Sequence, residues 1–305
     1  MADMPDRSTV PTLVRLGPDV LRDPKAALRR EWIVTNGLGG YASGTSTNVP
    51  TRAYHGYLIA ALHPPVDRTV LVSGLEERAG STRLEAAGLE SLELEGLLPV
   101  WRWRAGEAAV ERRVWMEHGR STTYVRYEAV RGRTELEIAP LVTSRDHQEV
   151  DRPAEEPALE PLSDGLRVRF LAGPAVTIRA TGGTFEPDGA WSGPIPLPEQ
   201  AARGEGDAAD AYRVGRLRLA LEPGSPVTVV LSTEREADVD LDGEAALARA
   251  RARQEGLIER ADGQGASGVV RQLVLAADQF LVERRIPRGA GEEPERGRTV
   301  IAGYH

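Results

Sequence analysis

The chain has 305 residues and no cysteine, and its 38 basic and 46 acidic residues give a formal net charge of −8. The lack of cysteine excludes a disulfide scaffold, a thiolate metal site and a cysteine nucleophile. The acidic balance disfavours nonspecific binding to nucleic acid or to an anionic membrane, and neither a signal-peptide pattern nor a run of about 18 apolar residues is present. We therefore expect a cytoplasmic protein with no nucleic-acid or membrane partner.

The N-terminal part is predicted to form two short strands on either side of a glycine-rich loop. The first strand is expected at residues 31–34, and the second is expected to begin near His55 and to run through Leu58 and Ile59. Between them, glycine occurs four times in eight residues, which permits positive φ angles and close backbone approach. These glycines are Gly37, Gly39, Gly40 and Gly44.

Beyond residue 68 the sequence alternates between apolar and charged residues at a period of two, which is typical of half-buried antiparallel strands. The alternating segments are 68–78, 110–116, 123–128, 136–141, 166–170, 176–178, 212–219 and 227–231. Amphipathic helices do not separate these strands, so a β-sandwich is favoured over a TIM barrel or a doubly wound sheet. Residues 150–164 and 186–210 are expected to be long exposed loops.

The period changes near residue 240, where helical spacing begins. Asp242 is predicted to cap a helix over residues 244–260, and a second helix is predicted over 267–284 because its apolar residues recur at i, i+3, i+4 and i+7. A flexible acidic loop is expected at 289–295. The apolar face of the second helix is expected to pack on the sandwich or on a neighbouring domain and to promote association if it is left uncovered.

Several motifs favour an ordinary structural role. Gly37 to Ala42 fits a dinucleotide-binding pattern, but turn and strand residues follow it in place of a helix. Trp101 and Trp103 share one strand face, so core packing is expected for at least one of them, although either could stack on a sugar ring. Adjacent Glu76 and Glu77 point to opposite faces of a strand, so they make no two-carboxylate site.

The histidines show no metal-binding spacing, and no metal or cofactor is expected. The run Arg145-Asp146-His147 resembles a triad fragment, but no serine-elbow motif accompanies it, so an Arg145–Asp146 ion pair is the favoured interpretation. The five histidines are His55, His63, His118, His147 and His305.

The glycine-rich loop and the residues after it are rich in neutral hydrogen-bonding groups, with Arg52, Tyr54 and His55 following closely. Amides and a guanidinium suit sugar hydroxyls, and aromatic rings suit the C–H faces of sugars. The alternative is a strand crossover stabilised by local hydrogen bonds.

Two segments, residues 32–45 (WIVTNGLGGYASGT) and 51–58 (TRAYHGYL), closely resemble the N-terminal domain of bacterial and archaeal-type glycogen debranching enzymes, the amylo-α-1,6-glucosidases. Residues 140–147, 276–282 and 299–305 also resemble that family, so the similarity extends over about 28–305. The resemblance implies a mainly β fold: a large antiparallel β-sandwich, the supersandwich of glucoamylase N-terminal domains, followed by a helical linker. Its implied boundaries are an extension at 1–27, the sandwich at 28–240, the linker at 241–288 and the start of an (α/α)₆ catalytic domain at 289–305.

In the family, the (α/α)₆ domain carries the paired acids that hydrolyse α-1,6 branches. We expect this chain to lack that domain and to be inactive alone, and we name no catalytic residue. The resemblance implies an α-glucan, such as glycogen or a limit dextrin, and the missing catalytic domain as partners. The alternative is a stand-alone α-glucan-binding or interaction module. The expected substrate-binding residues are Asn36, Tyr41, Arg52, Tyr54, His55, Arg145 and Asp146.

Overall fold

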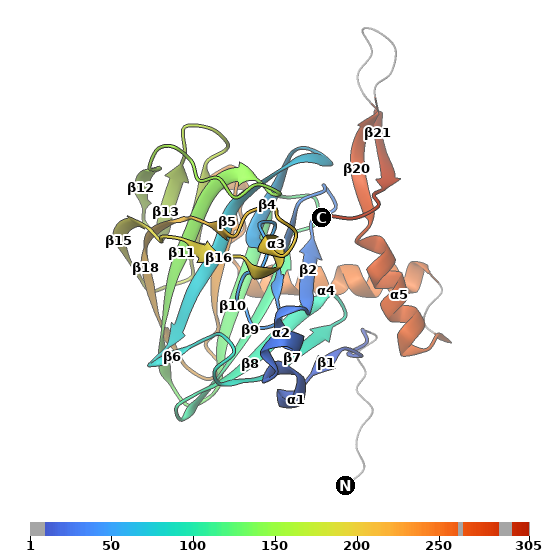
Figure 1. Cartoon of the computed structure of the whole chain (residues 1–305). Helices are drawn as coiled ribbons and strands as arrows, with labels where there is room; N and C mark the ends of the chain where they lie inside the picture. The colour runs from blue at the N-terminus through green and yellow to red at the C-terminus, as the bar shows by residue number, and fades with distance from the viewer. Residues whose placement is uncertain (1–9, 262–264, 287–294, 305) are drawn as a thin grey trace.

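The computed structural model describes residues 10–261, 265–286 and 295–304 and is mainly β (Figure 1). Two large sheets face each other, and every strand pairing within the described residues is antiparallel. The predicted β-sandwich is therefore confirmed. No helix in the described part of the chain is both long and apolar enough to cross a membrane.

The first sheet has nine strands. In spatial order they are β1 (Arg15–Leu16), β7 (Leu89–Glu95), β8 (Leu98–Ala105), β9 (Ala108–Met116), β10 (Thr122–Arg131), β19 (Val227–Ser232), β14 (Val176–Ala180), β13 (Gly165–Arg169) and β12 (Ala158–Leu162).

The second sheet has eight strands, and it ends at β2. Its strands in spatial order are β15 (Thr184–Trp191), β18 (Tyr212–Leu221), β11 (Thr134–Asp146), β5 (Val66–Ala79), β4 (Gly56–His63), β3 (Tyr41–Thr45) and β2 (Glu31–Thr35), with β6 (Thr82–Arg83) paired to β5.

The main core lies between the two sheets and contains a buried charge. Trp101 and Trp103 are both fully buried, where core packing was expected for at least one, and the Arg112 guanidinium lies 4.1 Å from the Trp101 ring centroid. Arg112 forms an ion pair with Glu77 and also donates a hydrogen bond to the Tyr57 hydroxyl at 2.8 Å. Arg112 belongs to the first sheet and Glu77 to the second, so this ion pair links the two sheets inside an otherwise apolar core.

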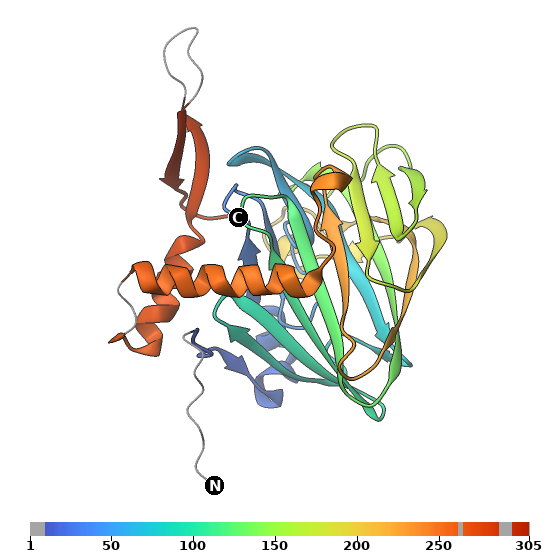
Figure 2. The same ribbon diagram turned by 180° about the vertical axis from the view of Figure 1, so that it is seen from behind.

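The predicted helix after residue 240 is confirmed as α4 (Gly243–Arg260), which crosses the outer face of the first sheet (Figure 2). Asp242 Oδ1 accepts the backbone N–H groups of Glu244 and Ala245, so it caps the helix as expected. Ala246 and Leu247 of α4 pack against a buried cluster on that face. The other helices are α1 (Pro18–Leu21), α2 (Pro24–Leu28), α3 (Pro198–Ala201) and α5 (Gly268–Asp278), with a 3₁₀ turn at Glu236–Asp238.

The helix expected over 267–284 is shorter than predicted. It ends at Asp278, and β20 (Leu281–Ile286) pairs with β21 (Glu295–Val300) in a hairpin that projects beside the sandwich (Figure 1). Leu281 lies opposite Val300, and Val282 lies opposite Thr299. Because these β-branched partners lie beyond the predicted helix, pairing with them places Leu281 and Val282 in a strand. The acidic loop expected at 289–295 lies outside the described residues except for Glu295.

The two expected loops also contain regular structure. Residues 150–164 include β12, and residues 186–210 include most of β15, helix α3 and a small ladder of β16 (Ile195–Pro196) with β17 (Ala208–Ala209). Their sequences lack clear alternation because β12 and β15 bury neither face: all of their residues are exposed or half-buried.

Candidate functional site

Three of the residues expected to bind substrate converge on one carboxylate, which the sequence did not single out. Glu31, the first residue of β2, lies 3.2 Å from Arg52 Nε and 3.3 Å from the Tyr54 hydroxyl, measured to its carboxylate oxygens. His55 Nε2 lies 3.4 Å from the same carboxylate. The loop between β3 and β4 therefore folds back onto the start of β2 and places an acid, a cation, a phenol and an imidazole together.

The His55 ring is fixed in one orientation by the loop. Its Nδ1 atom accepts the backbone N–H of Thr51 at 3.1 Å, so Nε2 carries the proton that faces Glu31. Burial, and secondarily the negative charge of Glu31, raises the pKa of Tyr54 to about 12, so this phenol stays protonated at neutral pH.

Arg145 serves as a clamp for main-chain carbonyl groups. Its guanidinium donates to Ala53 O at 2.7 Å, to Asp146 O at 3.1 Å and to Glu149 O. Burial lowers the pKa of Arg145 to about 10, so it remains a cation at neutral pH. Main-chain acceptors thus replace the predicted ion pair with the Asp146 carboxylate, which caps its own turn by accepting the Gln148 N–H at 2.8 Å.

Asn36 and Tyr41 lie at the opposite end of β2, around the glycine-rich loop. Asn36 is fully buried, its Oδ1 accepts the N–H groups of Leu38 and Gly40, and its Nδ2 donates to Arg120 O. Tyr41 is also buried and donates to Tyr54 O. The glycine-rich loop is followed by strand β3, which excludes the dinucleotide arrangement.

The glycines of this loop allow close packing against other segments. A Cβ atom at Gly39 would lie 2.5 Å from Pro65 O, and a Cβ atom at Gly37 would lie 2.3 Å from the His118 ring. Both residues have positive φ angles. The backbone N–H of Glu283 in β20 donates to Gly37 O, so the loop also contacts the C-terminal hairpin.

A cavity of about 360 Å³ lies between β3, β4 and β5 and a covering segment, residues 194–211, which includes β16, α3 and β17. Arg52, His55 and Arg145 line it, whereas Asn36, Tyr41, Tyr54 and Asp146 do not. The backbone N–H groups of Glu199 and Gln200 donate to Thr51 O, which fastens the covering segment over the 51–55 loop. The volume falls in the range of small-molecule sites, about 300–1,000 Å³.

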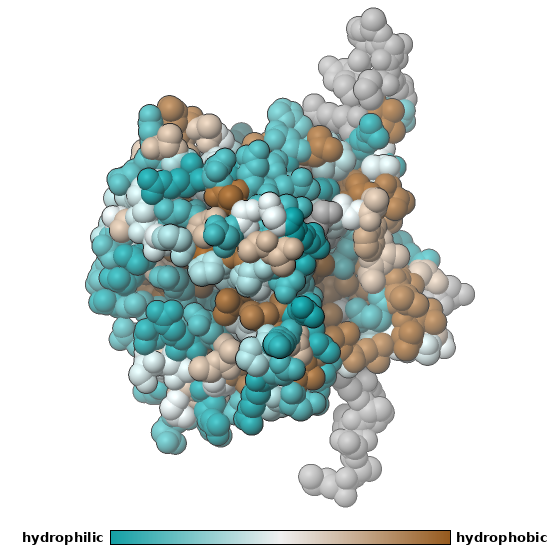
Figure 3. All heavy atoms as spheres, in the orientation of Figure 1, coloured by the Kyte–Doolittle hydropathy of each residue, from teal (hydrophilic) through white to brown (hydrophobic). Residues whose placement is uncertain are grey.

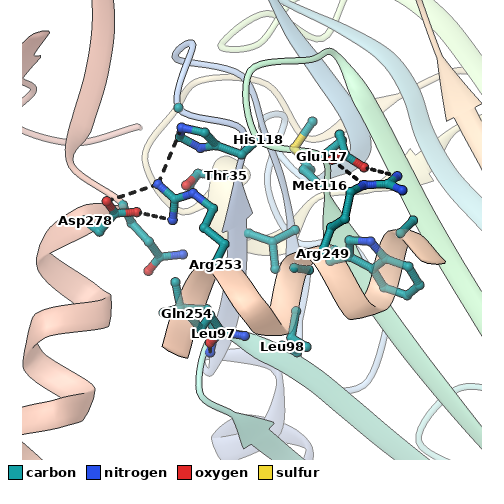
Figure 4. Close-up of a pocket in the computed structure, with 16 residues that line it drawn as sticks. Thr35, Leu97, Leu98, Met116, Glu117, His118, Arg249, Arg253, Gln254 and Asp278 are labelled. Carbon is teal, nitrogen blue, oxygen red and sulfur yellow. Dashed lines mark hydrogen bonds and ion pairs between the residues drawn. The ribbon is translucent and has the colours of Figure 1, made fainter. Parts of the chain in front are cut away.

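A second, smaller cavity of about 80 Å³ lies where α4 and α5 meet the sandwich (Figure 4). Arg253 of α4 forms a two-pronged ion pair with Asp278 and lies 3.5 Å from His118 Nε2. Burial and the Arg253 charge lower the pKa of His118, which favours its neutral form. This cavity has room for only a few waters, at about 30 Å³ each.

Sequence reasoning missed Glu31 and Trp32 as contributors to this region, and it counted Asn48 among the neutral hydrogen-bonding groups without naming it as a substrate-binding residue. The Trp32 side chain lines the larger cavity, and Asn48 links that lining to the core by donating to Glu77 at 2.8 Å. Asn48 has a φ of 66°, and asparagine tolerates this left-handed conformation better than most residues. Glu77 is buried and Glu76 exposed, as the strand alternation predicts. Among the residues the structure describes, no cluster of potential ligands could hold a metal ion.

These features define an antiparallel supersandwich domain with an attached helical segment and a polar cavity on one sheet. The family model for the N-terminal region of glycogen debranching enzymes matches residues 30–228, and the chain belongs to this family. A search of curated proteins finds no match.

Two solved structures are similar to the chain. One is described as a putative kojibiose phosphorylase from the human microbiome, with 10% identity and a TM-score of 0.43; the alignment covers 92% of this chain and 43% of that one. The other is a bacterial glucoamylase complexed with acarbose, with 8% identity and a TM-score of 0.44, covering 83% of this chain and 39% of that one. The chain therefore spans less than half the length of either structure.

Proposed function

We propose that this chain is the non-catalytic N-terminal part of an amylo-α-1,6-glucosidase that hydrolyses α-1,6 branch points in glycogen or related α-glucans. The observation that carries the proposal is the family match over residues 30–228, which includes Glu31, the 51–55 loop and Arg145. In this proposal the sandwich supplies the scaffold and part of the substrate contact, and an (α/α)₆ domain supplies the catalytic acids.

Glycoside hydrolysis requires one carboxylic acid to protonate the leaving oxygen and a second carboxylate about 5–10 Å away. The carboxylates near the larger cavity are mostly engaged by arginine. Glu31 pairs with Arg52, Glu85 lies 3.4 Å from Arg83, and Asp210 lies 3.1 Å from Arg152. We therefore assign no catalytic residue to this chain.

An uncovered apolar surface supports the proposed role of a neighbouring domain. Val270 and Leu273 on α5 are 47% and 63% exposed, and Val300 on β21 is 70% exposed. Figure 3 shows hydrophobic residues gathered on the side of the molecule where α5 and the hairpin lie. Large exposed apolar patches mark interaction sites, and we propose that the catalytic domain covers this one.

The test is release of glucose from a branched limit dextrin by this chain, by a purified (α/α)₆ domain of the same family, and by both together. We expect activity from the mixture, none from this chain, and less from the catalytic domain alone. Glucose release by this chain alone would contradict the proposal. The same would hold if adding this chain left the glucose-releasing activity of the catalytic domain unchanged.

The alternative is a stand-alone α-glucan-binding module, which the 360 Å³ cavity favours because it needs no second domain to form. Sedimentation with glycogen separates the two functions. Retention of the isolated chain on glycogen without any effect on a catalytic domain would favour the module.

A further inference from the structure

We infer that Tyr304 is a positioning residue, which holds the 51–55 loop of the candidate site in place through Tyr41. That loop carries the three side chains that meet at the Glu31 carboxylate. A role of this position in the reaction of a glycoside hydrolase rests on the proposed function, whereas the contacts and their test concern this chain alone.

Tyr304 lies buried against the second sheet. The segment after β21 leads from the hairpin back to the sandwich, where the Tyr304 side chain is only 5% exposed (Figure 1). It packs in a cluster whose strand residues alternate with those of the main core, so the cluster lies on the outer face of the sheet. The members are Ile33, Tyr41, Tyr54, Ile59, Val70, Ile301 and Tyr304.

The Arg68 side chain of β5 fixes Tyr304 in this cluster. Its guanidinium lies 5.2 Å from the centroid of the Tyr304 ring, and its Nη1 donates to Tyr304 O at 3.0 Å. Its Nε donates to Gly39 O at 3.0 Å, so one arginine ties the terminal segment to the glycine-rich loop. The Tyr304 hydroxyl in turn donates to Gln279 O at 2.7 Å. These contacts restrain the ring on several sides.

Tyr41 connects Tyr304 to the 51–55 loop. The two rings meet edge to face with their centroids 5.4 Å apart. The Tyr41 hydroxyl donates to Tyr54 O at 3.3 Å, and burial raises the pKa of Tyr41 far above its ordinary value, so the phenol keeps its proton. Tyr54 carries the contact onward, because its own hydroxyl lies 3.3 Å from Glu31.

One buried ring thus links two segments that are about 250 residues apart in the sequence. Packed rings have few alternative arrangements, so loss or displacement of Tyr304 should move Tyr41 and weaken its hold on Tyr54. In the proposed enzyme, a domain that follows the terminal segment would share this anchor with the 51–55 loop.

The experiment is amide hydrogen exchange of the full chain, followed by mass spectrometry of peptides that contain residues 51–55. We expect Tyr304→Ala to speed exchange of this loop about fivefold, as for the loss of one aromatic pair. Val300→Ala is the matched control, because it shortens a side chain that is 70% exposed four positions earlier, and it should leave the loop unchanged. The reporting N–H groups, which have acceptors within the chain, are those of Thr51, Ala53 and His55.

Two further variants separate positioning from a general loss of packing. Tyr304→Phe keeps the ring and loses the bond to Gln279 O, so the 51–55 loop should retain most of its protection. Tyr41→Phe removes the hydroxyl that donates to Tyr54 O. In a chain that already carries Tyr41→Phe, Tyr304→Ala should therefore have little further effect on the loop.

The role of Arg68 is measured on the same peptides. Arg68→Met removes both main-chain contacts and should reproduce the faster exchange that Tyr304→Ala causes. Arg78→Met is the control on the same strand, since the Arg78 side chain is exposed and should leave the loop unchanged.

The inference is overturned if Tyr304→Ala speeds exchange only within residues 299–304, or if Val300→Ala or Tyr304→Phe acts on the loop as strongly. If Tyr304→Ala fails to fold, the two Arg→Met variants decide. Loop exchange that responds to Tyr304→Ala, without glucose release that depends on the chain, would reject only the proposed function. The reverse pattern would reject only the positioning role.

Discussion

His55 Nε2 faces the Glu31 carboxylate at 3.4 Å, while its Nδ1 accepts the backbone N–H of Thr51 at 3.1 Å. The His55 imidazole thus contacts both the backbone of the 51–55 loop and the Glu31 carboxylate. We expect His55→Ala to lower the free energy of unfolding by about 2 kcal/mol, because the Thr51 N–H loses its acceptor in a buried site. Urea unfolding measures the change, with exposed His63→Ala expected to shift it by less than about 0.5 kcal/mol. Equal effects at the two histidines would contradict this role.

The buried Glu77–Arg112 pair predicts strong coupling between its members. Removing one partner leaves the other charge uncompensated, so Glu77→Leu or Arg112→Leu alone should cost about 3–5 kcal/mol. The double variant should cost clearly less than the sum of the two. A double-mutant cycle from chemical unfolding measures the coupling, and additive costs would show that the two groups are independent.

The Asn36 amide predicts a graded response at the glycine-rich loop. Asn36→Ala removes the acceptor for Leu38 and Gly40 and the donor to Arg120 O, and it should cost about 2–3 kcal/mol. Asn36→Asp keeps the acceptor but places a carboxylate oxygen against Arg120 O in a fully buried site, so it should cost at least as much. Thermal unfolding ranks the two variants. A smaller loss for the Asp variant would mean that the turn accepted by Oδ1, and not the Nδ2 contact, determines stability.

The buried tyrosines predict loss of stability at alkaline pH. Burial raises the pKa of Tyr54 and of Tyr124 to about 12, whereas an unfolded tyrosine ionises near 10.0. The folded state thus holds protons that the unfolded state releases, so stability is complete below pH 10 and falls as pH rises toward 12. Arg145, with a pKa of about 10, opposes this trend, but three more buried tyrosines with raised pKa values outweigh it: Tyr41, Tyr57 and Tyr127.

Unfolding by urea at several values between pH 8 and pH 12 measures this dependence. Phenolate absorbance of the folded protein follows the tyrosines directly. A free energy of unfolding that stays constant across that interval would contradict the assignment.

The apolar surface on α5 predicts self-association of the isolated chain. Leu273→Asp should reduce association, as measured by sedimentation velocity, with little effect on the melting temperature because Leu273 is 63% exposed. The control is Leu275→Asp on the same helix, which buries a carboxylate and should lower the melting temperature sharply. Association that is unaffected by Leu273→Asp would place the contact elsewhere.

The sequence predicted the sandwich and α4 because each depends on a short-range signal. Strand alternation gives the period of two, and Asp242 marks the helix start. The end of α5 and the hairpin of β20 with β21 were missed because pairing of Leu281 with Val300 is a long-range contact that no local pattern reveals. The covering segment was missed for a related reason, since its short elements are ordered by contacts with Thr51.

The candidate site was only partly predictable. Arg52, Tyr54 and His55 are close in sequence, so their proximity was foreseeable, and Arg145 was implied only by resemblance. Glu31 meets them through the pairing of β2 with β3, and it carries no motif of its own. Asn36 is a residue type suited to sugar binding, yet both of its side-chain polar atoms form hydrogen bonds within the chain.

The contact between Gln279 and β2 bears on solubility. β2 is the last strand of its sheet, and the Gln279 Nε2 group, just beyond α5, donates to Ile33 O on that strand at 3.2 Å. A terminal strand with free main-chain groups is a template for intermolecular β-pairing. The segment after α5 therefore covers part of this edge. Detaching it would expose β2 to intermolecular β-pairing and promote fibrillar aggregation, which the sequence of the sandwich alone does not indicate.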